Sequence, residues 1–146
     1  LNPKIKLDLS DPNWRIYSRT PSAPPHYIAD SAKVQNSLIT EGCNIYGSVD
    51  FSILFDNVTI EEGATVNDSL VMPGAVIKKG ASVQYSIVAE NAVIGEDAAV
   101  GERPEKCSDL ESWGVTVVGA GLTVGKNVKI AAGEIVKEDR TEGDGK

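Results

Sequence analysis

Aromatic residues, histidine and cysteine are scarce in this chain of 146 residues. Only 5% of the residues are aromatic, and the chain has one histidine and two cysteines. With so few aromatic rings, a core must be built from Val, Ile, Leu and Ala, and that composition favours β structure. The length suits one domain with a core of its own.

The sequence also lacks an apolar run long enough to cross a bilayer, and it has no charged-then-apolar leader. Its formal net charge of −7 repels nucleic acid phosphates and anionic lipid surfaces. We therefore expect a cytoplasmic protein that binds neither nucleic acid nor membrane. The chain begins at Leu1 rather than Met, and we expect it to be a piece of a longer protein.

What the sequence does contain is an internal repeat, which is the signature of a solenoid. A spacing of seventeen relates Ile60, Ile77 and Ile94; Val66, Val83 and Val100; and the triplets Ser69-Leu70-Val71 and Ser86-Ile87-Val88. A spacing of six relates Val118, Val124, Ile130 and Val136. The unit is a hexad that starts with an aliphatic residue. Three hexads make a coil of about eighteen residues, often with one shortened corner.

Gly, Asn or Asp stands at the corners between hexads, where these residues tolerate the left-handed backbone of a tight bend. The corner pairs are Glu62-Gly63, Lys79-Gly80, Glu96-Asp97 and Lys126-Asn127. Three corners per coil predict a triangular prism in which the first residue of each hexad points inward. At about 1.5–3 kcal/mol per buried Val or Ile, this ladder is expected to be the main stabilising contribution. An ordinary β-sandwich would not produce hexads in register.

The hexads resemble the left-handed parallel β-helix of the hexapeptide-repeat proteins. We therefore predict an all-β fold, a single-stranded left-handed parallel β-helix of about six coils over residues 28–136. The left hand comes from the resemblance, since general chirality rules favour right-handed crossovers. A loop insertion is expected at 102–116, with Trp113 folding back over the coils. Residues 1–27 read as a connector, and residues 137–146 as a charged tail.

The sequence lacks the catalytic groups on which β-helical enzymes rely. Hexapeptide acyltransferases use a histidine base, and β-helical carbonic anhydrases use three zinc-binding histidines. His26 precedes the first coil beside two prolines and reads as a connector residue. Cys43 takes the small position equivalent to Ala64 and Ala81, so we interpret it as a buried reduced thiol. Cys107 lies in the loop without a partner in sequence, and we expect neither a nucleophile nor a metal site in this chain.

Several motifs resemble the C-terminal third of bacterial ADP-glucose pyrophosphorylases (glucose-1-phosphate adenylyltransferases). They are Asp11-Pro12-Asn13-Trp14-Arg15-Ile16, Pro24-Pro25-His26-Tyr27, Asn36-Ser37-Leu38-Ile39, Glu41-Gly42-Cys43-Asn44-Ile45, Ser52-Ile53-Leu54-Phe55 and Asp68-Ser69-Leu70-Val71-Met72-Pro73. The Gly-Cys, Ser-Ile-Leu-Phe and Met-Pro elements are more specific than generic hexads. The resemblance covers Pro12 through Gly101.

The resemblance implies an upstream nucleotidyltransferase domain, outside this chain, that converts ATP and glucose 1-phosphate to ADP-glucose and pyrophosphate with Mg²⁺ for glycogen synthesis. The fragment itself is then expected to be inactive. Its β-helix would support a homotetramer, pack beside its own catalytic domain and help to form the cleft for an anionic metabolite effector. The alternatives are the non-catalytic regulatory subunit of the same enzyme and, from another class, a hexapeptide-repeat acyltransferase.

The candidate effector-binding residues are the cations nearest the connector and one corner: Arg15, Arg19, Lys78 and Lys79. Where some sugar-phosphate-activated relatives place an arginine after a coil, this chain has Ala89-Glu90-Asn91. Leu54 and Phe55 are the candidate interface residues, because a solenoid leaves flat aliphatic faces that proteins use for pairing. We expect both side chains to point outward.

Overall fold

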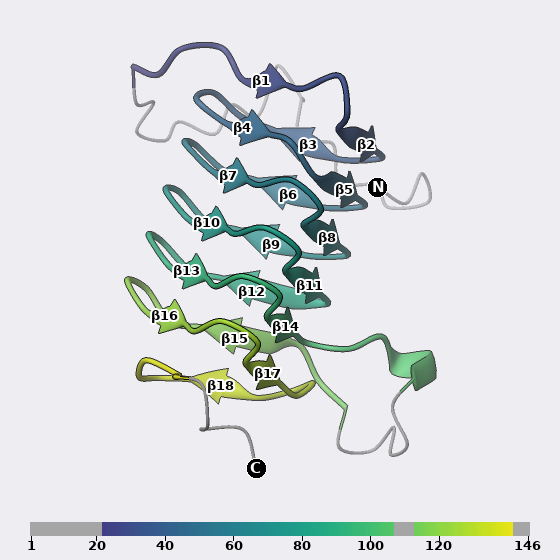
Figure 1. Cartoon of the computed structure of the whole chain (residues 1–146), viewed down its shortest axis with the longest axis vertical. Helices are drawn as coiled ribbons and strands as arrows, with labels where there is room; N and C mark the ends of the chain where they lie inside the picture. The colour runs from purple at the N-terminus through teal and green to yellow at the C-terminus, as the bar shows by residue number, and fades with distance from the viewer. Residues whose placement is uncertain (1–21, 107–112, 142–146) are drawn as a thin grey trace, which may run out of the picture.

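The computed structural model describes residues 22–106 and 113–141. Within these ranges the chain forms 18 short strands and one 3-10 helix, η1 (Pro104–Lys106). The strands assemble into three parallel six-stranded sheets, which are the three sides of a prism (Figure 1). The predicted all-β solenoid of about six coils is confirmed, and its left hand stays a prediction.

Each sheet takes one strand from every coil. Sheet A consists of β1 (Tyr27–Ile28), β4 (Asn44–Ile45), β7 (Thr59–Ile60), β10 (Val76–Ile77), β13 (Val93–Ile94) and β16 (Thr123–Val124). Sheet B consists of β2 (Lys33–Gln35), β5 (Ser48–Asp50), β8 (Thr65–Asn67), β11 (Ser82–Gln84), β14 (Ala99–Val100) and β17 (Lys129–Ile130). Sheet C consists of β3 (Leu38–Ile39), β6 (Ile53–Leu54), β9 (Leu70–Val71), β12 (Ser86–Val88), β15 (Thr116–Val118) and β18 (Ile135–Val136).

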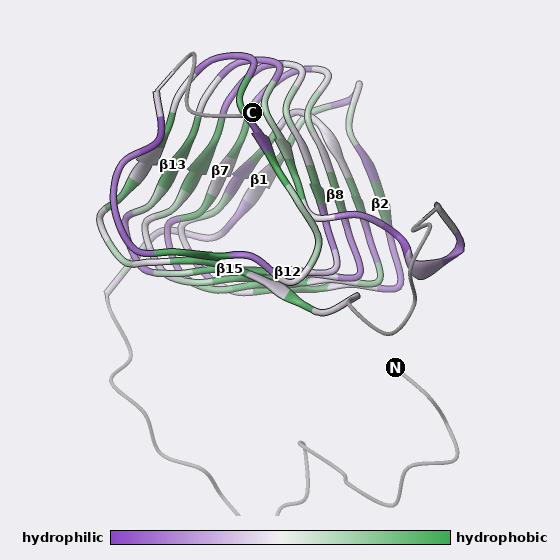
Figure 2. Cartoon of the chain, turned by 90° about the horizontal axis from the view of Figure 1, so that it is seen from below, coloured by the Kyte–Doolittle hydropathy of each residue, from purple (hydrophilic) through white to green (hydrophobic). Residues whose placement is uncertain are grey.

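The core is a ladder of aliphatic side chains inside the prism, whose three sides Figure 2 shows end-on. Its columns are Ile45, Ile60, Ile77, Ile94 and Val124 from sheet A; Val49, Val66, Val83, Val100 and Ile130 from sheet B; and Leu54, Val71, Val88, Val118 and Val136 from sheet C. None of these side chains is more than 5% exposed. The predicted inward position of the first hexad residue is therefore confirmed.

Glycine, asparagine and aspartate form the corners, as the sequence predicts. Between sheets A and B, Gly63, Gly80, Asp97 and Asn127 have φ of 72°, 71°, 55° and 58°. The corner between sheets B and C is one residue shorter in the coils of seventeen. At the B–C corners of the first four coils, Asn36, Phe51, Asp68 and Tyr85 take φ of 46°, 47°, 49° and 46°. Bulky aromatic residues rarely adopt this backbone, so Phe51 and Tyr85 are held there by the surrounding coils.

The two largest departures from a coil of seventeen residues occur at corners. At the A–B corner of the second coil, Gly47 makes the turn in two fewer residues, so Ile45 pairs with Ile60 at a spacing of fifteen. A Cβ on Gly47 would meet the carbonyl oxygens of Ala64 and Glu61, which is why this tight corner needs glycine. The second departure is the insertion between β14 and β15, which leaves the prism at the B–C corner (Figure 1).

The two ends of the described solenoid differ. The first strand, β1, follows an exposed stretch that contains His26. At the other end, part of the predicted tail lies against the last coil. The backbone of Arg140 forms an isolated parallel β-bridge with Val124, and the Arg140 guanidinium lies 2.7 Å from the Glu134 carboxylate. Across the described ranges, no helix has the length and apolarity that a bilayer crossing needs.

Candidate functional site

The outer face of sheet C is built from the repeated serine–aliphatic–aliphatic triplets. Along Ser86-Ile87-Val88 the side chains are buried, exposed and buried in turn. Strand geometry imposes this alternation, because successive side chains point to opposite faces. The middle residue of each triplet therefore faces outward, although it belongs to the same sequence repeat as the core.

Leu54 was predicted to be an exposed interface residue, and this is wrong. Its side chain is fully buried in the core, and the outward residue of its triplet is Ile53. Phe55, which follows the strand, is half-buried. The prediction assigned the outward position one residue too late along the strand, and a shift of one residue moves a side chain to the opposite face.

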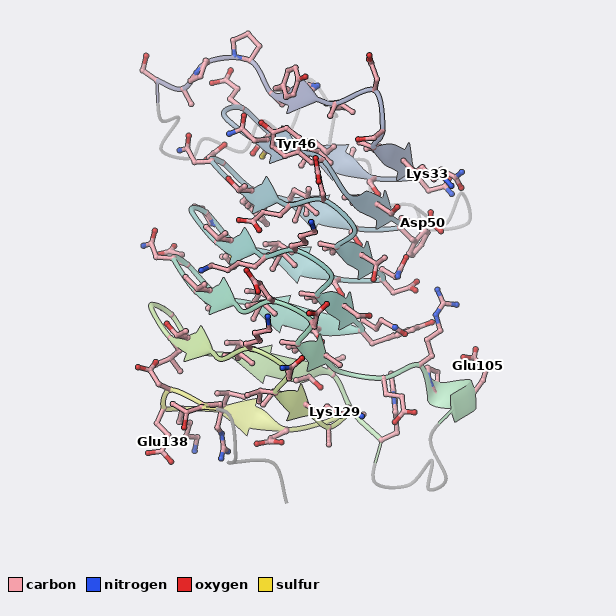
Figure 3. All side chains as sticks on the ribbon, in the orientation of Figure 1. Lys33, Tyr46, Asp50, Glu105, Lys129 and Glu138 are labelled. Atoms are coloured by element: carbon pink, nitrogen blue, oxygen red, sulfur yellow. The ribbon has the colours of Figure 1, made fainter. Side chains whose placement is uncertain are left out.

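The outward positions of sheet C form one aliphatic column along the prism. Register pairs them from coil to coil in the order Leu38, Ile53, Leu70, Ile87, Val117 and Ile135. The corresponding column of sheet B is Lys33, Ser48, Thr65, Ser82, Ala99 and Lys129. Lys33 and Lys129 project from its first and last strands (Figure 3). The outer face of sheet C is thus apolar, whereas the outer face of the neighbouring sheet B is mostly polar.

A ladder of serine hydroxyls supports the B–C corner next to this face. The Ser52 and Ser69 amides donate to the hydroxyls of Ser37 and Ser52, and the Ser86 amide donates to the Ser69 hydroxyl, each at 3.1 Å. Each hydroxyl donates in turn to the carbonyl two residues earlier, as Ser69 does to Asn67 at 2.6 Å. These bonds satisfy buried polar groups and fix the path of the corner.

The insertion and the B–C corner turn the apolar face into a groove of about 410 Å³. Its lining comprises Asn36, Leu38, Phe51, Ser52, Ile53, Asp68, Ser69, Leu70, Tyr85, Ser86, Ile87 and Val115. Trp113 stacks edge-on against Tyr85, with 5.5 Å between the ring centroids, and its indole donates to the Glu102 carbonyl at 2.8 Å. The predicted return of Trp113 over the coils is thereby confirmed. Arg103 reaches Asp68 at 3.5 Å across the same corner.

Sequence reasoning missed this groove, although a signal was present. Leu70 and Ile87 are aliphatic at the second place of their triplets, where an outward side chain would ordinarily be polar. The shared spacing of seventeen identifies the repeat, but it does not distinguish inward from outward residues.

Of the four predicted effector-binding cations, Arg15 and Arg19 lie outside the described residues. Lys78 and Lys79 are exposed at an A–B corner. Lys79 borders a pocket of about 280 Å³ together with Tyr46, Glu61 and Glu62. Acidic groups surround these lysines, so an anion bound there would meet repulsion as well as attraction.

The electrostatics of this corner also involve Glu96 in the next coil. Its carboxylate lies 2.9 Å from the Lys126 ammonium, which lowers the pKa of Glu96, and Lys78 and Lys79 add to the effect. The corner is therefore a mixed-charge surface, with carboxylates and ammonium groups interleaved between coils.

Cys43 is buried, at 1% exposure, and burial raises the pKa of its thiol. The thiol donates to the Phe55 carbonyl at 3.0 Å. Its predicted equivalence with Ala64 and Ala81 is wrong, because register places Cys43 at the C–A corner, in the column of Val58 and Ala75. The two corners share the same glycine-then-small pattern, so the sequence alone does not separate them. No group of three or more His, Cys, Asp or Glu side chains suited to a metal occurs in the described ranges.

Comparisons with solved structures agree with this fold. A mutant perosamine N-acetyltransferase from Caulobacter crescentus superposes with a TM-score of 0.53 at 20% identity, over 83% of this chain and 52% of that protein. A putative acetyltransferase from Desulfovibrio desulfuricans G20 gives 0.62 at 16% identity, over 84% of this chain and 27% of that one. At such identities the likeness concerns the fold alone.

Curated relatives confirm the resemblance inferred from the motifs. The glucose-1-phosphate adenylyltransferase of Bacillus mycoides (strain KBAB4) is 56% identical over 71 residues, which are 49% of this chain and 19% of the relative. That of Bacillus anthracis is 55% identical over the same shares. The match thus spans about a fifth of the length of these relatives. The family model described as GlmU-like, C-terminal hexapeptide matches residues 25–125, most of the chain. The chain therefore belongs to the GlmU-like C-terminal hexapeptide family.

Proposed function

We propose that this chain is the β-helical domain of a glucose-1-phosphate adenylyltransferase. The observation that carries the proposal is the 56% identity over 71 residues to enzymes of that name. In the full-length protein, an upstream domain would convert ATP and glucose 1-phosphate to ADP-glucose and pyrophosphate. ATP and Mg²⁺ would bind in that domain, and this chain would contribute to assembly and regulation.

The character of the coils supports a scaffolding role for this part of the protein. Inward positions are aliphatic on all three sheets, and the outward column of sheet C is aliphatic as well. The single histidine, His26, is exposed ahead of β1. Burial and surface chemistry of this kind suit packing against other protein rather than bond-making chemistry.

Pyrophosphate release from ATP and glucose 1-phosphate, measured with Mg²⁺, tests the proposal. We expect turnover by the full-length protein and none by this chain alone. Turnover by the isolated chain would overturn its role as a scaffold. A full-length protein that is inactive alone but alters a catalytic partner would be the regulatory subunit. Thiol release from acetyl-CoA with an amino-sugar acceptor would instead indicate an acyltransferase.

Regulation is tested in the full-length protein by titrating phosphate, AMP and fructose 1,6-bisphosphate. Arg15→Ala with Arg19→Ala should weaken the response to an anionic effector if the connector contributes to its site. Lys78→Ala with Lys79→Ala is the comparison, because acidic groups surround those lysines. An unchanged response in the arginine variant, with the tetramer intact by sedimentation, would remove the connector from the site.

A further inference from the structure

A short segment that follows β18 lies against the C-terminal end of the prism. At this end β16 is the last strand of sheet A, β17 of sheet B and β18 of sheet C. After β18 the chain returns to sheet A, where the backbone of Arg140 pairs with Val124 in parallel. The unpaired amides and carbonyls of an edge strand are a template for another strand, so a solenoid must cover its ends or use them for association.

The segment satisfies the backbone groups that β16 directs toward the open end. The Arg140 amide donates to the Thr123 carbonyl at 2.9 Å, and the Gly125 amide donates to the Arg140 carbonyl at 2.7 Å. The Thr123 amide donates to the Asp139 carboxylate at 2.8 Å. Residues 139 and 140 therefore stand where the first strand of a further coil would stand.

Arg140 occupies the position of the next core residue in sheet A. One coil earlier, the Gly95 amide donates to the Val124 carbonyl at 2.7 Å, in the pattern that Gly125 and Arg140 repeat. Residues paired in register on parallel strands point to the same face, so Arg140 continues the inward column that ends with Val124. The column is thus completed by a charged residue instead of an aliphatic one.

The Arg140 side chain is held against the end of the prism by an ion pair. Its guanidinium lies 2.7 Å from the Glu134 carboxylate, and the two side chains are 28% and 34% exposed. The Nε of Arg140 is buried and finds no hydrogen-bond partner among the described residues. Stacking an apolar coil on this partly buried charge would remove its remaining water, which costs free energy. Inward-pointing charges are one of the devices by which proteins prevent edge-to-edge pairing.

The edge that would match β16 lies at the other end of the prism. β1 is the first strand of sheet A among the described residues. The Tyr27 and Ala29 amides donate to carbonyls in and just before β4, at 2.8 and 2.9 Å. Because successive amides along a strand point in opposite directions, the Ile28 amide points away from β4. Ile28 is in register with Ile45 and is 42% exposed, so it presents the amide and the inward side chain that a neighbouring coil requires.

We propose that residues 137–140 are a cap that prevents head-to-tail stacking of this chain, because they fill the place on β16 where β1 of a second copy would pair. Without the cap, the three parallel sheets would continue from the last coil of one copy into the first coil of the next. Such a contact joins two different surfaces and does not close, so it would propagate into an open row of copies. The inference concerns the coils alone and does not depend on the proposed enzymatic activity.

Sedimentation velocity of shortened chains tests the proposal. A chain that ends at Val136 lacks the cap, and a chain that ends at Thr141 keeps it and is the matched control. We expect the weight-average mass of the uncapped chain to exceed that of the control by about twofold or more and to rise with concentration. In the complete chain, Arg140→Pro removes the amide that bonds to Thr123 and should have the same effect. Glu138→Ala, at an exposed position of the cap, should have none.

Ile28→Pro, added to the chain that ends at Val136, separates edge pairing from unspecific association. It removes the amide that would bond to the next copy but keeps the bonds to β4, and edge strands tolerate proline. We expect the mass to return to that of the control.

Circular dichroism identifies the variants that keep the β-helix. A folded uncapped chain, shortened or with Arg140→Pro, that has the mass of its control would overturn the cap. Association that survives Ile28→Pro would overturn β1 as the partner edge. Loss of the fold in both uncapped variants would show that the segment is needed to form the last coil, and it would overturn the blocking role.

Discussion

Neighbouring residues of one strand have opposite roles in this molecule. Leu54 is fully buried inside the prism, whereas Ile53 points outward and lines the groove. Leu54→Ala removes buried atoms and leaves a cavity between stacked coils, so we expect the free energy of unfolding to fall by about 2–5 kcal/mol. Ile53→Ala should cost less, because its side chain is only half-buried. Urea denaturation of both variants measures the difference, and equal losses would contradict the assigned phase.

The Cys43 thiol is expected to be chemically silent in the folded protein. In a Cys107→Ser chain Cys43 is the only thiol. Its burial excludes the reagent, and its raised pKa keeps the thiol protonated and therefore unreactive. Its reaction with a disulfide reagent should therefore proceed only as fast as the coil opens, and it should become rapid in urea. Fast reaction under native conditions would show that the coil around Cys43 opens locally.

The same thiol makes stability depend on pH in a defined direction. Because burial raises the pKa of Cys43 in the folded state, its contribution to stability is complete below the unfolded-state value of about 8.5. That contribution is lost as pH rises through the folded-state value. The Cys107→Ser chain should therefore lose stability more steeply above pH 8.5 than the same chain with Cys43→Ala, as measured by urea denaturation across that range.

At the scale of elements, the corners decide where the chain bends. Gly74 and Gly121 occupy equivalent C–A corners with φ of 72° and 68°. A Cβ on Gly74 would collide with the Asn91 side chain, whereas one on Gly121 would meet nothing within 4 Å. We expect Gly121→Ala to cost about 1–2 kcal/mol from backbone strain alone, and Gly74→Ala to cost more. Thermal unfolding of the pair separates strain from crowding, and an equal cost would show that Asn91 moves aside freely.

The repeating elements could be predicted from sequence, because buried aliphatic residues and left-handed corners recur at constant spacing. Ile60, Ile77 and Ile94 are one such column. The groove was missed, because the shortened corner before Leu54 obscures which residues of the triplets face outward, although the outward aliphatic residues Leu70 and Ile87 were a signal. The contact between Trp113 and Tyr85 depends on the path of a loop that no periodicity constrains.

At the scale of the whole molecule, coils behave as interchangeable units because each pairs only with its neighbours. Deleting the seventeen residues 60–76 joins Thr59 to Ile77. Ile77 then takes the place of Ile60, with which it is paired in register. We expect the shortened chain to keep its β spectrum and to unfold with an m-value lower by about one sixth, since less surface is exposed.

A deletion of sixteen residues, 60–75, is the control for the coil deletion. It would place Val76 at an inward position and turn Ile77 outward, reversing every side chain until the next corner. This variant should lose its cooperative transition. Cooperative folding of the sixteen-residue deletion, equal to that of the seventeen-residue deletion, would show that register is not fixed by the core.

The insertion between β14 and β15 affects the order in which the chain can fold. Most neighbouring strands are joined by 15 to 18 residues, but Ser86 pairs with Thr116, thirty residues away. Closing the longer loop costs about 0.5 kcal/mol more in chain entropy than closing a loop of seventeen. Zipping from the N-terminal coils should therefore pause after β14, and the last coils would join in a later kinetic phase. The loop that shapes one wall of the groove is thus also the connection between coils whose closure costs the most chain entropy.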